Sequence, residues 1–283
     1  DLSGWNKSVM NADDYRAYVG GTSGLIYGYV NDGFYKVEDF EYFDSKSRTW
    51  KLKEGVVDSS PLSDTPRPGN AKFKKLTPVD PNSSNPYQLT EADRTVIGNT
   101  TPKFSGGFGL NATYKGFDLS MFFNFMYDFD VFNANKVMLT TWADNHENNF
   151  GMEVASDKRW RNFDDMGNEI RYSPELLAEF NKNATMWNPT SIGKPISMSY
   201  AVEDGSFLRL NSATLGYTLP QEWTKKAGLN KVRFYVAGSN LFTITGYSGY
   251  DPEVDIATGL TPNIDNNRYP RSRTYTFGAQ LTF

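Results

Sequence analysis

The chain has 283 residues, a hydrophobic fraction of 39% and a formal net charge of -4. No run of residues approaches the roughly 18 apolar positions that a membrane-spanning helix needs, which excludes a helical membrane protein. The acidic balance argues against nucleic acid as a partner, and the absence of cysteine excludes disulfides and thiolate metal sites.

Residues 1–103 are expected to hold one short strand with a turn, followed by a long connection. Leu25–Val30 is rich in β-forming residues, and Asn31-Asp32-Gly33 supplies turn chemistry after it. Prolines recur after Lys36, and few regular elements tolerate that density. The chain begins at Asp1 without the pattern of a signal peptide, so we expect a removed leader or a longer polypeptide. Three charged residues near the start are expected on a solvated face: Asp13, Asp14 and Arg16.

Residues 104–127 predict a hairpin of two long strands. In Phe104–Tyr114 and in Phe117–Tyr127, apolar residues alternate with mainly polar or small ones, and Lys115-Gly116 forms the turn. The rings at the turn end would share the apolar face, and membrane interfaces favour aromatic rings there. Strands of soluble sandwiches are more often about five or six residues long, so this length favours a strand that crosses a membrane.

A long connection, residues 128–206, follows and holds one predicted helix, which is capped by Ser173 and starts at Pro174. Phe207–Leu219 then alternates as a strand. Its first two leucines do not share the parity of the later apolar residues, so we expect a β-bulge near Asn211.

Residues 220–230 predict a short helical turn that ends at Gly228 in a left-handed conformation. Lys231–Phe242 predicts another strand, in which Val, Phe and Val face outward and Arg233 lies on the opposite face. A third long connection, residues 243–272, contains several glycines and prolines.

The last eleven residues, Arg273–Phe283, alternate between apolar and polar side chains and end on an aromatic ring. About ten alternating residues is also the length that a tilted strand needs to cross a bilayer. We expect this strand to carry the signal for assembly into the membrane, and we expect removal of Phe283 to impair insertion. The predicted assembly residues are Tyr275, Phe277, Leu281 and Phe283.

Long connections alternate with short ones along the chain. Antiparallel strands that cross a membrane place all short turns on one side, as outer-membrane barrels do with short periplasmic turns and long extracellular loops. The predicted fold class is therefore all-β, with strands of a transmembrane antiparallel β-barrel and long extracellular loops. Five predicted long strands cannot close a barrel, for which about eight is the minimum, so further strands are expected in a longer polypeptide.

Six stretches carry a more specific signal because of their order and spacing. They are Asp93–Gly107, Val202–Leu210, Thr214–Pro220, Ser239–Thr243, Ser248–Glu253 and Tyr269–Gly278. Together they resemble the C-terminal third of SusC/RagA-type TonB-dependent transporters of Bacteroidota, and Leu25–Phe34 is similar to another segment of that family. The resemblance covers most of residues 93–283.

The resemblance implies the C-terminal strands of an outer-membrane barrel of about 22 strands that imports oligosaccharides or peptides as nutrients. It implies a SusD-like surface lipoprotein as lid, and energy from the TonB complex through a plug-bearing N-terminal part that nothing in this chain resembles. Residues 104–283 would form barrel strands with extracellular loops 128–206 and 243–272, and residues 1–103 a strand, a turn and a long extracellular loop region. The barrel would lie in outer-membrane lipid with its C-terminus in the periplasm.

The residues offer little for chemistry on a substrate, so we expect no enzyme and no cofactor. His146 is the only histidine, which leaves no basis for a catalytic triad or a multi-histidine metal site. The carboxylates Asp164-Asp165, Asp251, Glu253 and Asp255 are expected to shape turns rather than to act as paired glycosidase carboxylates.

One segment departs from the family. Its members often carry a run of Asp, Asn and Gly with calcium-loop spacing before the Asp93 stretch, whereas Leu76–Asn85 holds a single carboxylate, so we expect no metal there. We also expect Asp93 and Arg94 to form a local, exposed ion pair that contributes little to stability.

Aromatic side chains in predicted outer loops are expected either to stack on a substrate or to pack the loops against the lid. They are Trp142, Trp160, Trp187, Tyr247, Tyr250 and Tyr269. Arg209 and Arg233 are expected to face the lumen, where each lines the import path or pairs with a carboxylate on a neighbouring strand that this chain does not include.

Two other classes of protein stay open at this point. One is a secreted β-sandwich that binds or degrades glycans, and the other is a structural outer-membrane protein without transport. Partition into detergent separates the first from a barrel, and a plug with a TonB-contacting segment separates the second from an importer.

Overall fold

The computed structural model describes residues 14–62, 65–141, 151, 154, 158–192, 196–254 and 259–283. The chain divides into two units: unit 1 contains Asp1–Asn99, Phe132–Val202 and Ala257–Asn266, and unit 2 contains Thr100–Val131, Glu203–Ile256 and Asn267–Phe283. Among the described residues no helix is both long and apolar enough to span a bilayer.

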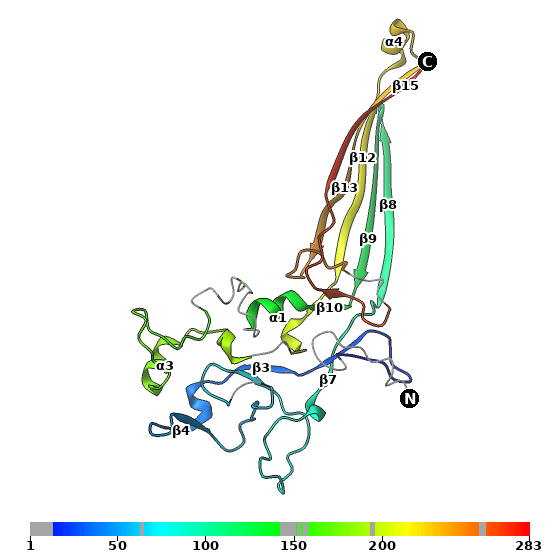
Figure 1. The fold of residues 1–283 in the computed structure, drawn as a ribbon. Helices are drawn as coiled ribbons and strands as arrows, with labels where there is room; N and C mark the ends of the chain where they lie inside the picture. The colour runs from blue at the N-terminus through cyan, green and yellow to red at the C-terminus, as the bar shows by residue number, and fades with distance from the viewer. Residues whose placement is uncertain are drawn as a thin grey trace. The chain divides into compact units, whose positions relative to one another are not determined.

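Unit 2 is built on a five-stranded antiparallel sheet in the order β15-β13-β12-β9-β8 (Figure 1). Its strands are β8 (Phe104–Tyr114), β9 (Phe117–Tyr127), β12 (Phe207–Thr218), β13 (Lys231–Thr245) and β15 (Thr274–Thr282). The sheet is open, since the outer strands β8 and β15 each pair on one side only within the described part of the chain. Mainly β structure and long antiparallel strands are thus confirmed.

The hairpin β8–β9 has the predicted bounds and turn. Lys115 has φ 45° and Gly116 has φ 86°, so both central residues of the two-residue turn are left-handed, as a type I′ turn requires. A side chain at Gly116 would come within 2.8 Å of the carbonyl oxygen of Thr218, so glycine is required there for two reasons. The turn thereby fixes the register of the whole hairpin, from Tyr114 opposite Phe117 onward.

The predicted bulge in β12 is confirmed, because the pairing with both β9 and β13 shifts between Leu210 and Ser212. Asn211 is the extra residue, and it brings the early leucines onto the same face as the later apolar residues. The next connection is also as predicted: α4 (Gln221–Thr224) and a 3₁₀ turn, η6 (Lys225–Ala227), end at Gly228 with φ 72°.

Unit 1 consists of short elements. Strands β1 (Tyr15–Arg16), β2 (Leu25–Gly28) and β7 (Thr95–Asn99) form one sheet, β3 (Asn31–Phe34) pairs with β6 (Ala71–Phe73), and β4 (Phe40–Asp44) pairs with β5 (Thr49–Leu52). Among the described residues of the unit, the other elements are η2 (Val37–Asp39), η3 (Glu91–Asp93), α1 (Ala134–Thr140), α3 (Pro174–Phe180), η4 (Pro189–Ser191), η5 (Ser199–Ala201) and β14 (Ile264–Asp265). Strands β10 (Asp130–Asn133) and β11 (Val202–Asp204) lie where the chain passes from one unit to the other.

Helix α3 is confirmed together with its cap, since the hydroxyl of Ser173 accepts a hydrogen bond from the backbone N–H of Leu176. Other predictions for unit 1 were wrong. Asn31-Asp32-Gly33 is not a turn but part of β3, whose irregular pairing with β6 accommodates Gly33 at φ 75°. The proline-rich segment holds several short strands, because its prolines fall between the strands rather than inside them.

The prediction that Asp14 lies on a solvated face was also wrong. It is buried rather than solvated, and its Oδ1 accepts a hydrogen bond of 2.7 Å from the hydroxyl of Ser197. Arg16 is half-buried with its guanidinium 3.6 Å from the centre of the Tyr27 ring. Asp13 lies outside the described residues.

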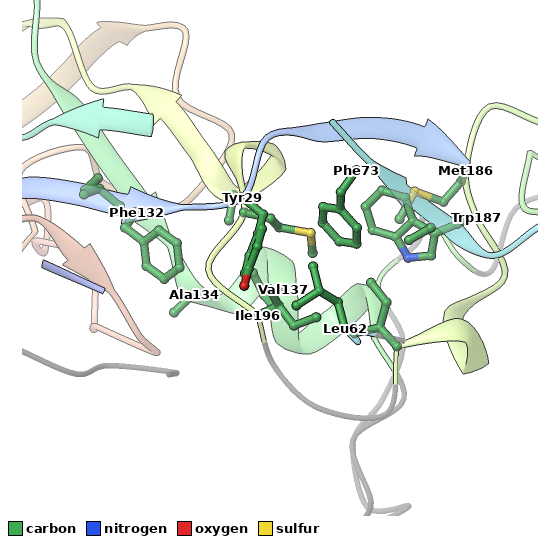
Figure 2. Packing of buried hydrophobic residues seen from close by; sticks show 14 of the residues in the cluster. Tyr29, Leu62, Phe73, Phe132, Ala134, Val137, Met186, Trp187 and Ile196 are labelled. Atoms are coloured by element: carbon green, nitrogen blue, oxygen red, sulfur yellow. The ribbon is translucent and has the colours of Figure 1, made fainter. Parts of the chain in front are cut away.

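A core of buried apolar side chains holds these short elements together. Figure 2 shows Tyr29, Phe73, Val137 and Trp187 among the side chains that gather in it. The contributing segments are far apart in sequence, so burial of their apolar side chains joins elements that strand pairing alone does not connect.

Candidate functional site

The long-strand sheet of unit 2 has one strongly apolar face. The register pairs Phe108 with Phe123, Leu215 with Val236 and Val236 with Phe277, so these side chains point to the same side. Many large apolar side chains on this face are exposed: Phe104, Phe108, Leu110, Tyr114, Phe117, Tyr127, Leu215, Phe234, Val236, Phe242, Ile244, Tyr275, Phe277 and Leu281. An exposed apolar surface that is continuous over neighbouring strands marks contact with a membrane or another apolar body.

The opposite face of the same sheet is polar or flat. Ser105, Asn111, Thr113, Asp118, Ser120, Asn124, Thr214, Arg233, Thr276 and Gln280 share it. Glycines on this face leave room for neighbouring side chains: a Cβ at Gly107 would come within 2.7 Å of the Phe122 ring, and one at Gly278 within 2.4 Å of the Tyr235 ring. The rings therefore lie over the glycines and project little from this face of the sheet.

Three of the predicted assembly residues, Tyr275, Phe277 and Leu281, lie on the apolar face of the edge strand β15, and Phe277 is 79% exposed. The terminal Phe283 is exposed as well. None of the four is packed into a core.

Arg209, at the start of β12, is 2% exposed and lies in a buried cluster of charges. Its Nη1 and Nη2 donate to the two carboxylate oxygens of Asp251, at 3.3 Å and 2.5 Å, and its Nη2 lies 3.7 Å from Glu253. Glu253 in turn pairs with Arg271 at 2.8 Å. The four side chains thus connect β12 to two separate segments of the connection before β15.

Asp251 also accepts hydrogen bonds from the backbone. The N–H of Glu253 donates to it within the turn that starts at Asp251, and the N–H of Arg271 donates to it from further along the connection. The turn-forming role expected for Asp251 is therefore confirmed. Burial raises the pKa of its carboxyl, but the hydrogen bonds from Arg209 and from the backbone outweigh burial and hold the pKa below its ordinary value. The group is a carboxylate at neutral pH and keeps the cluster charge-balanced.

Arg233 on β13 pairs with a carboxylate two strands away. Its Nε donates to Asp118 Oδ1 at 2.9 Å, and its Nη2 donates to Asp118 Oδ2. The side chain crosses β12 at Gly216, where an added Cβ would come within 2.3 Å of Arg233 Nη2. The sequence left open whether such an arginine pairs with a neighbouring carboxylate, and here the partner belongs to β9 of the same chain.

The aromatic residues expected in outer loops differ in exposure. Trp160 and Trp187 are buried in unit 1, and Tyr247 is buried in a small cluster of unit 2. Tyr250 and Tyr269 are 84% and 92% exposed, and each stands within two positions of a member of the Arg209 cluster. Contact of these residues with a substrate or a lid stays a prediction. Trp142, His146 and Asp255 lie outside the described residues.

The prediction that Asp93 and Arg94 form an exposed ion pair with each other is wrong. Both side chains are buried, and each has other partners. Arg94 Nη2 donates to the backbone carbonyl of Tyr27 at 3.1 Å and lies 3.5 Å from Asp14. Neighbouring residues in a chain point in different directions after a short 3₁₀ turn, which is why they do not meet.

Asp93 is surrounded by donors. Its Oδ1 accepts from the backbone N–H groups of Leu76 and Thr77 and from the Thr77 hydroxyl, at 2.9, 2.7 and 2.6 Å. Its Oδ2 accepts from the backbone and hydroxyl of Thr90, and Lys75 Nζ lies 3.3 Å away. Sequence reasoning missed this site because its donors lie up to 18 residues away along the chain.

Within the part of the chain that the structure describes, no cluster of three or more His, Cys, Asp or Glu side chains has the arrangement of a metal site. The segment Leu76–Asn85 is held instead by Asp93 at one end and by an Asx turn at Asp80.

No protein-family model matches the chain. The chain is 32% identical over 266 residues to TonB-dependent receptor P3 of Formosa agariphila, in an alignment that covers 92% of this chain and 22% of that protein. It is also 37% identical over 86 residues to TonB-dependent receptor SusC of Bacteroides thetaiotaomicron, which covers 30% of this chain and 8% of SusC.

Among solved structures, the RagAB peptide transporter matches with a TM-score of 0.60 and 22% identity, over 93% of this chain and 23% of the matched chain. This likeness concerns the fold. The chain spans about a fifth of the length of TonB-dependent receptor P3, a curated relative that matches most of this chain. Over most of its length the chain is thus a homologue of the SusC/RagA-type TonB-dependent receptors, a family of transporters rather than enzymes.

Proposed function

We propose that this chain forms the C-terminal barrel strands of a SusC-like importer in the bacterial outer membrane, in a larger barrel of about 22 strands. The observation that carries the proposal is the apolar face that runs across all five long strands of unit 2 while the opposite face is polar. Strands of nine to fifteen residues are long enough to cross a bilayer at a tilt. The open edges β8 and β15 are where further strands of the barrel would pair.

In this proposal the apolar face contacts lipid and the polar face, with Arg233, lines the lumen. The short turn Lys115-Gly116, the connection 219–230 and the C-terminus lie in the periplasm. The connections 128–206 and 246–273 and the long connection within residues 1–103 lie on the extracellular side. The length difference between the two sets of connections supports this orientation, because outer-membrane barrels share it.

We further propose that the importer takes up oligosaccharides or peptides and works with a SusD-like lipoprotein as its lid. Its similarity to SusC and to the RagAB peptide transporter supports this choice of partner and substrates. TonB would supply energy through the plug-bearing part of the polypeptide. Tyr250 and Tyr269 are the exposed aromatic side chains that we assign to contact with substrate or lid.

Import is tested by uptake of fluorescent oligosaccharides and peptides into cells that produce the complete protein. We expect cells that produce the protein to take up one of these classes faster than cells without it, and we expect a protonophore, which removes the energy source of TonB, to lower that uptake to the level of cells without the protein. Uptake that is unchanged in both conditions would leave a structural membrane protein as the better explanation.

The two faces of the sheet are tested by single cysteines, which the chain allows because it has none of its own. Spin labels at Val236→Cys and Phe277→Cys are expected to collide with lipid-soluble oxygen. Labels at the adjacent positions Ala237→Cys and Thr276→Cys serve as matched controls and are expected to collide with a water-soluble nickel chelate. Power-saturation electron paramagnetic resonance in lipid vesicles measures both, and equal access of the chelate to all four positions would contradict the proposal.

A further inference from the structure

Unit 1 contains a surface cavity of about 510 Å³ that no part of the proposed import mechanism uses. Three arginines line it, Arg159, Arg161 and Arg171, and the other polar residues of the lining are Asn162, Asp164, Asp165, Asn188 and Thr190. A guanidinium group only donates hydrogen bonds, so a ligand rich in acceptors can bind here if the arginines are not all paired with the two carboxylates.

The segment that carries the arginines is held firmly. The backbone N–H of Arg161 donates to Asn181 Oδ1 at 2.6 Å, and the backbone N–H of Trp160 donates to the carbonyl of Met186 at 2.8 Å. The chain then turns back on itself, with Phe163 paired to Glu169 and with the N–H of Ile170 bonded to the carbonyl of Asn162. Arg161 and Arg171 are therefore carried on the two arms of one turn.

Three carboxylates of this segment, Asp164, Asp165 and Glu169, equal the three arginines in number, but they do not all pair with them. Asp164 is occupied by its own turn, because it accepts from the side chain and backbone of Asn168 and from the backbone of Met166. Those hydrogen bonds also lower the pKa of its carboxyl, so it stays ionised and keeps that role.

Each of the three arginines can take up a further acceptor. Arg159 Nη1 donates to the carbonyl of Val154 at 3.3 Å, and it forms no ion pair with any residue that the structure describes. Arg161 pairs at 2.7 Å with Asp165, whose side chain is 75% exposed, and an exposed pair of this kind is weak. Arg171 pairs with Glu169, whose side chain is also exposed.

We propose that this cavity binds the carboxylate group of an acidic ligand. The planar fork of an arginine matches a carboxylate with two parallel hydrogen bonds, and Phe163, which is exposed at the same wall, supplies an apolar contact beside the charge. The carboxylate would come from a uronic acid residue of an oligosaccharide or from the C-terminus of a peptide. The proposal rests on the proposed function only for the origin of the ligand, since binding itself does not require transport.

The test measures binding of small probes to the purified, complete protein in detergent by isothermal titration calorimetry. A trigalacturonate and a tripeptide with a free C-terminus are compared with a neutral trigalactose and with the same tripeptide amidated at its C-terminus. We expect at least one carboxylate probe to bind about tenfold more tightly than its neutral counterpart, and the difference to shrink as salt is raised. The probe that binds identifies the source of the carboxylate.

Arg159→Gln is expected to weaken that binding by about tenfold. Lys158→Gln removes the same charge at the adjacent, exposed position outside the cavity lining, and it is expected to leave binding unchanged. The proposal is overturned if neither carboxylate probe is preferred over its neutral counterpart by the wild-type protein, a comparison that needs no variant. It is also overturned if a correctly folded Arg159→Gln protein binds as the wild type does. Failure of uptake in cells would affect only the proposed function.

Discussion

Replacing Arg209 by methionine is expected to destabilise unit 2 by about 3 to 5 kcal/mol. The side chain is almost fully buried and is the main partner of Asp251. Its removal would leave the carboxylates of Asp251 and Glu253 in a buried site with only Arg271, which is partly exposed, to compensate them. A buried carboxylate without its partner costs far more than an exposed pair contributes.

Urea unfolding of the protein in lipid vesicles measures this effect. Arg273→Met is the matched control, because Arg273 is exposed and lies at the end of the connection that also carries Arg271, and a change within about 0.5 kcal/mol is expected there. The double variant Arg209→Met with Asp251→Asn is expected to recover part of the lost stability, since it no longer buries an unpaired charge at that pair. Equal losses in the Arg209 and Arg273 variants would show that the cluster does not hold the loops.

The same cluster also predicts a pH dependence with a definite sign. The pKa of Asp251 is lower in the folded protein than in the unfolded chain, so its contribution to stability is complete above the ordinary pKa of aspartate, about 3.9. That contribution is lost as pH falls through the lower, folded pKa. Without Arg209, only the backbone hydrogen bonds from Glu253 and Arg271 oppose the effect of burial on the pKa, and the loss is expected to begin at higher pH.

The long strands were predictable because their information is local. Alternation within Phe104–Tyr114 and Phe117–Tyr127, with a two-residue turn, is enough to define the hairpin and its register. The change in the alternation of apolar residues before Asn211 indicated the bulge, and Ser173 and Gly228 indicated a helix start and a helix end. Each of these signals lies within a few residues of the structure that it predicts.

The buried charges were not predictable in the same way, because their partners are distant in sequence. Asp14 meets Ser197 across 183 positions and Arg94 across 80. Arg209 meets Asp251 across 42 positions. A single sequence gives the charge of each residue but not its neighbours in space, so all of these side chains were expected at the surface, in the lumen or in a simple turn.

Replacing Asp93 by asparagine is expected to destabilise unit 1 by about 3 kcal/mol. The carboxylate accepts from two segments at once, Leu76-Thr77 and Thr90, with Lys75 close by. An amide offers one acceptor oxygen in place of two, and its NH₂ group would face the donors of either Thr77 or Thr90. The variant therefore loses charge, loses acceptors and places donor against donor in a buried site.

The pH dependence provides an independent check on this account. Burial alone would raise the pKa of Asp93, but hydrogen bonds from Thr77, Thr90 and Leu76 outweigh it and hold the pKa well below the ordinary range. The stabilisation is thus present above about pH 3.9 and is lost only as pH falls further toward the folded pKa. The difference between wild type and Asp93→Asn is expected to be largest at neutral pH and to shrink in acid.

Hydrogen exchange followed by mass spectrometry locates the effect. The amides of Leu76, Thr77 and Thr90 donate to Asp93 and are expected to exchange faster in Asp93→Asn. Asp80→Asn is the matched control: it removes the same charge from an exposed side chain whose Oδ1 accepts from Asn82, an acceptor that asparagine retains. If the two variants were equally stable, or if the three amides kept their protection, Asp93 would be no more than a turn residue and the two segments would be joined by apolar packing alone.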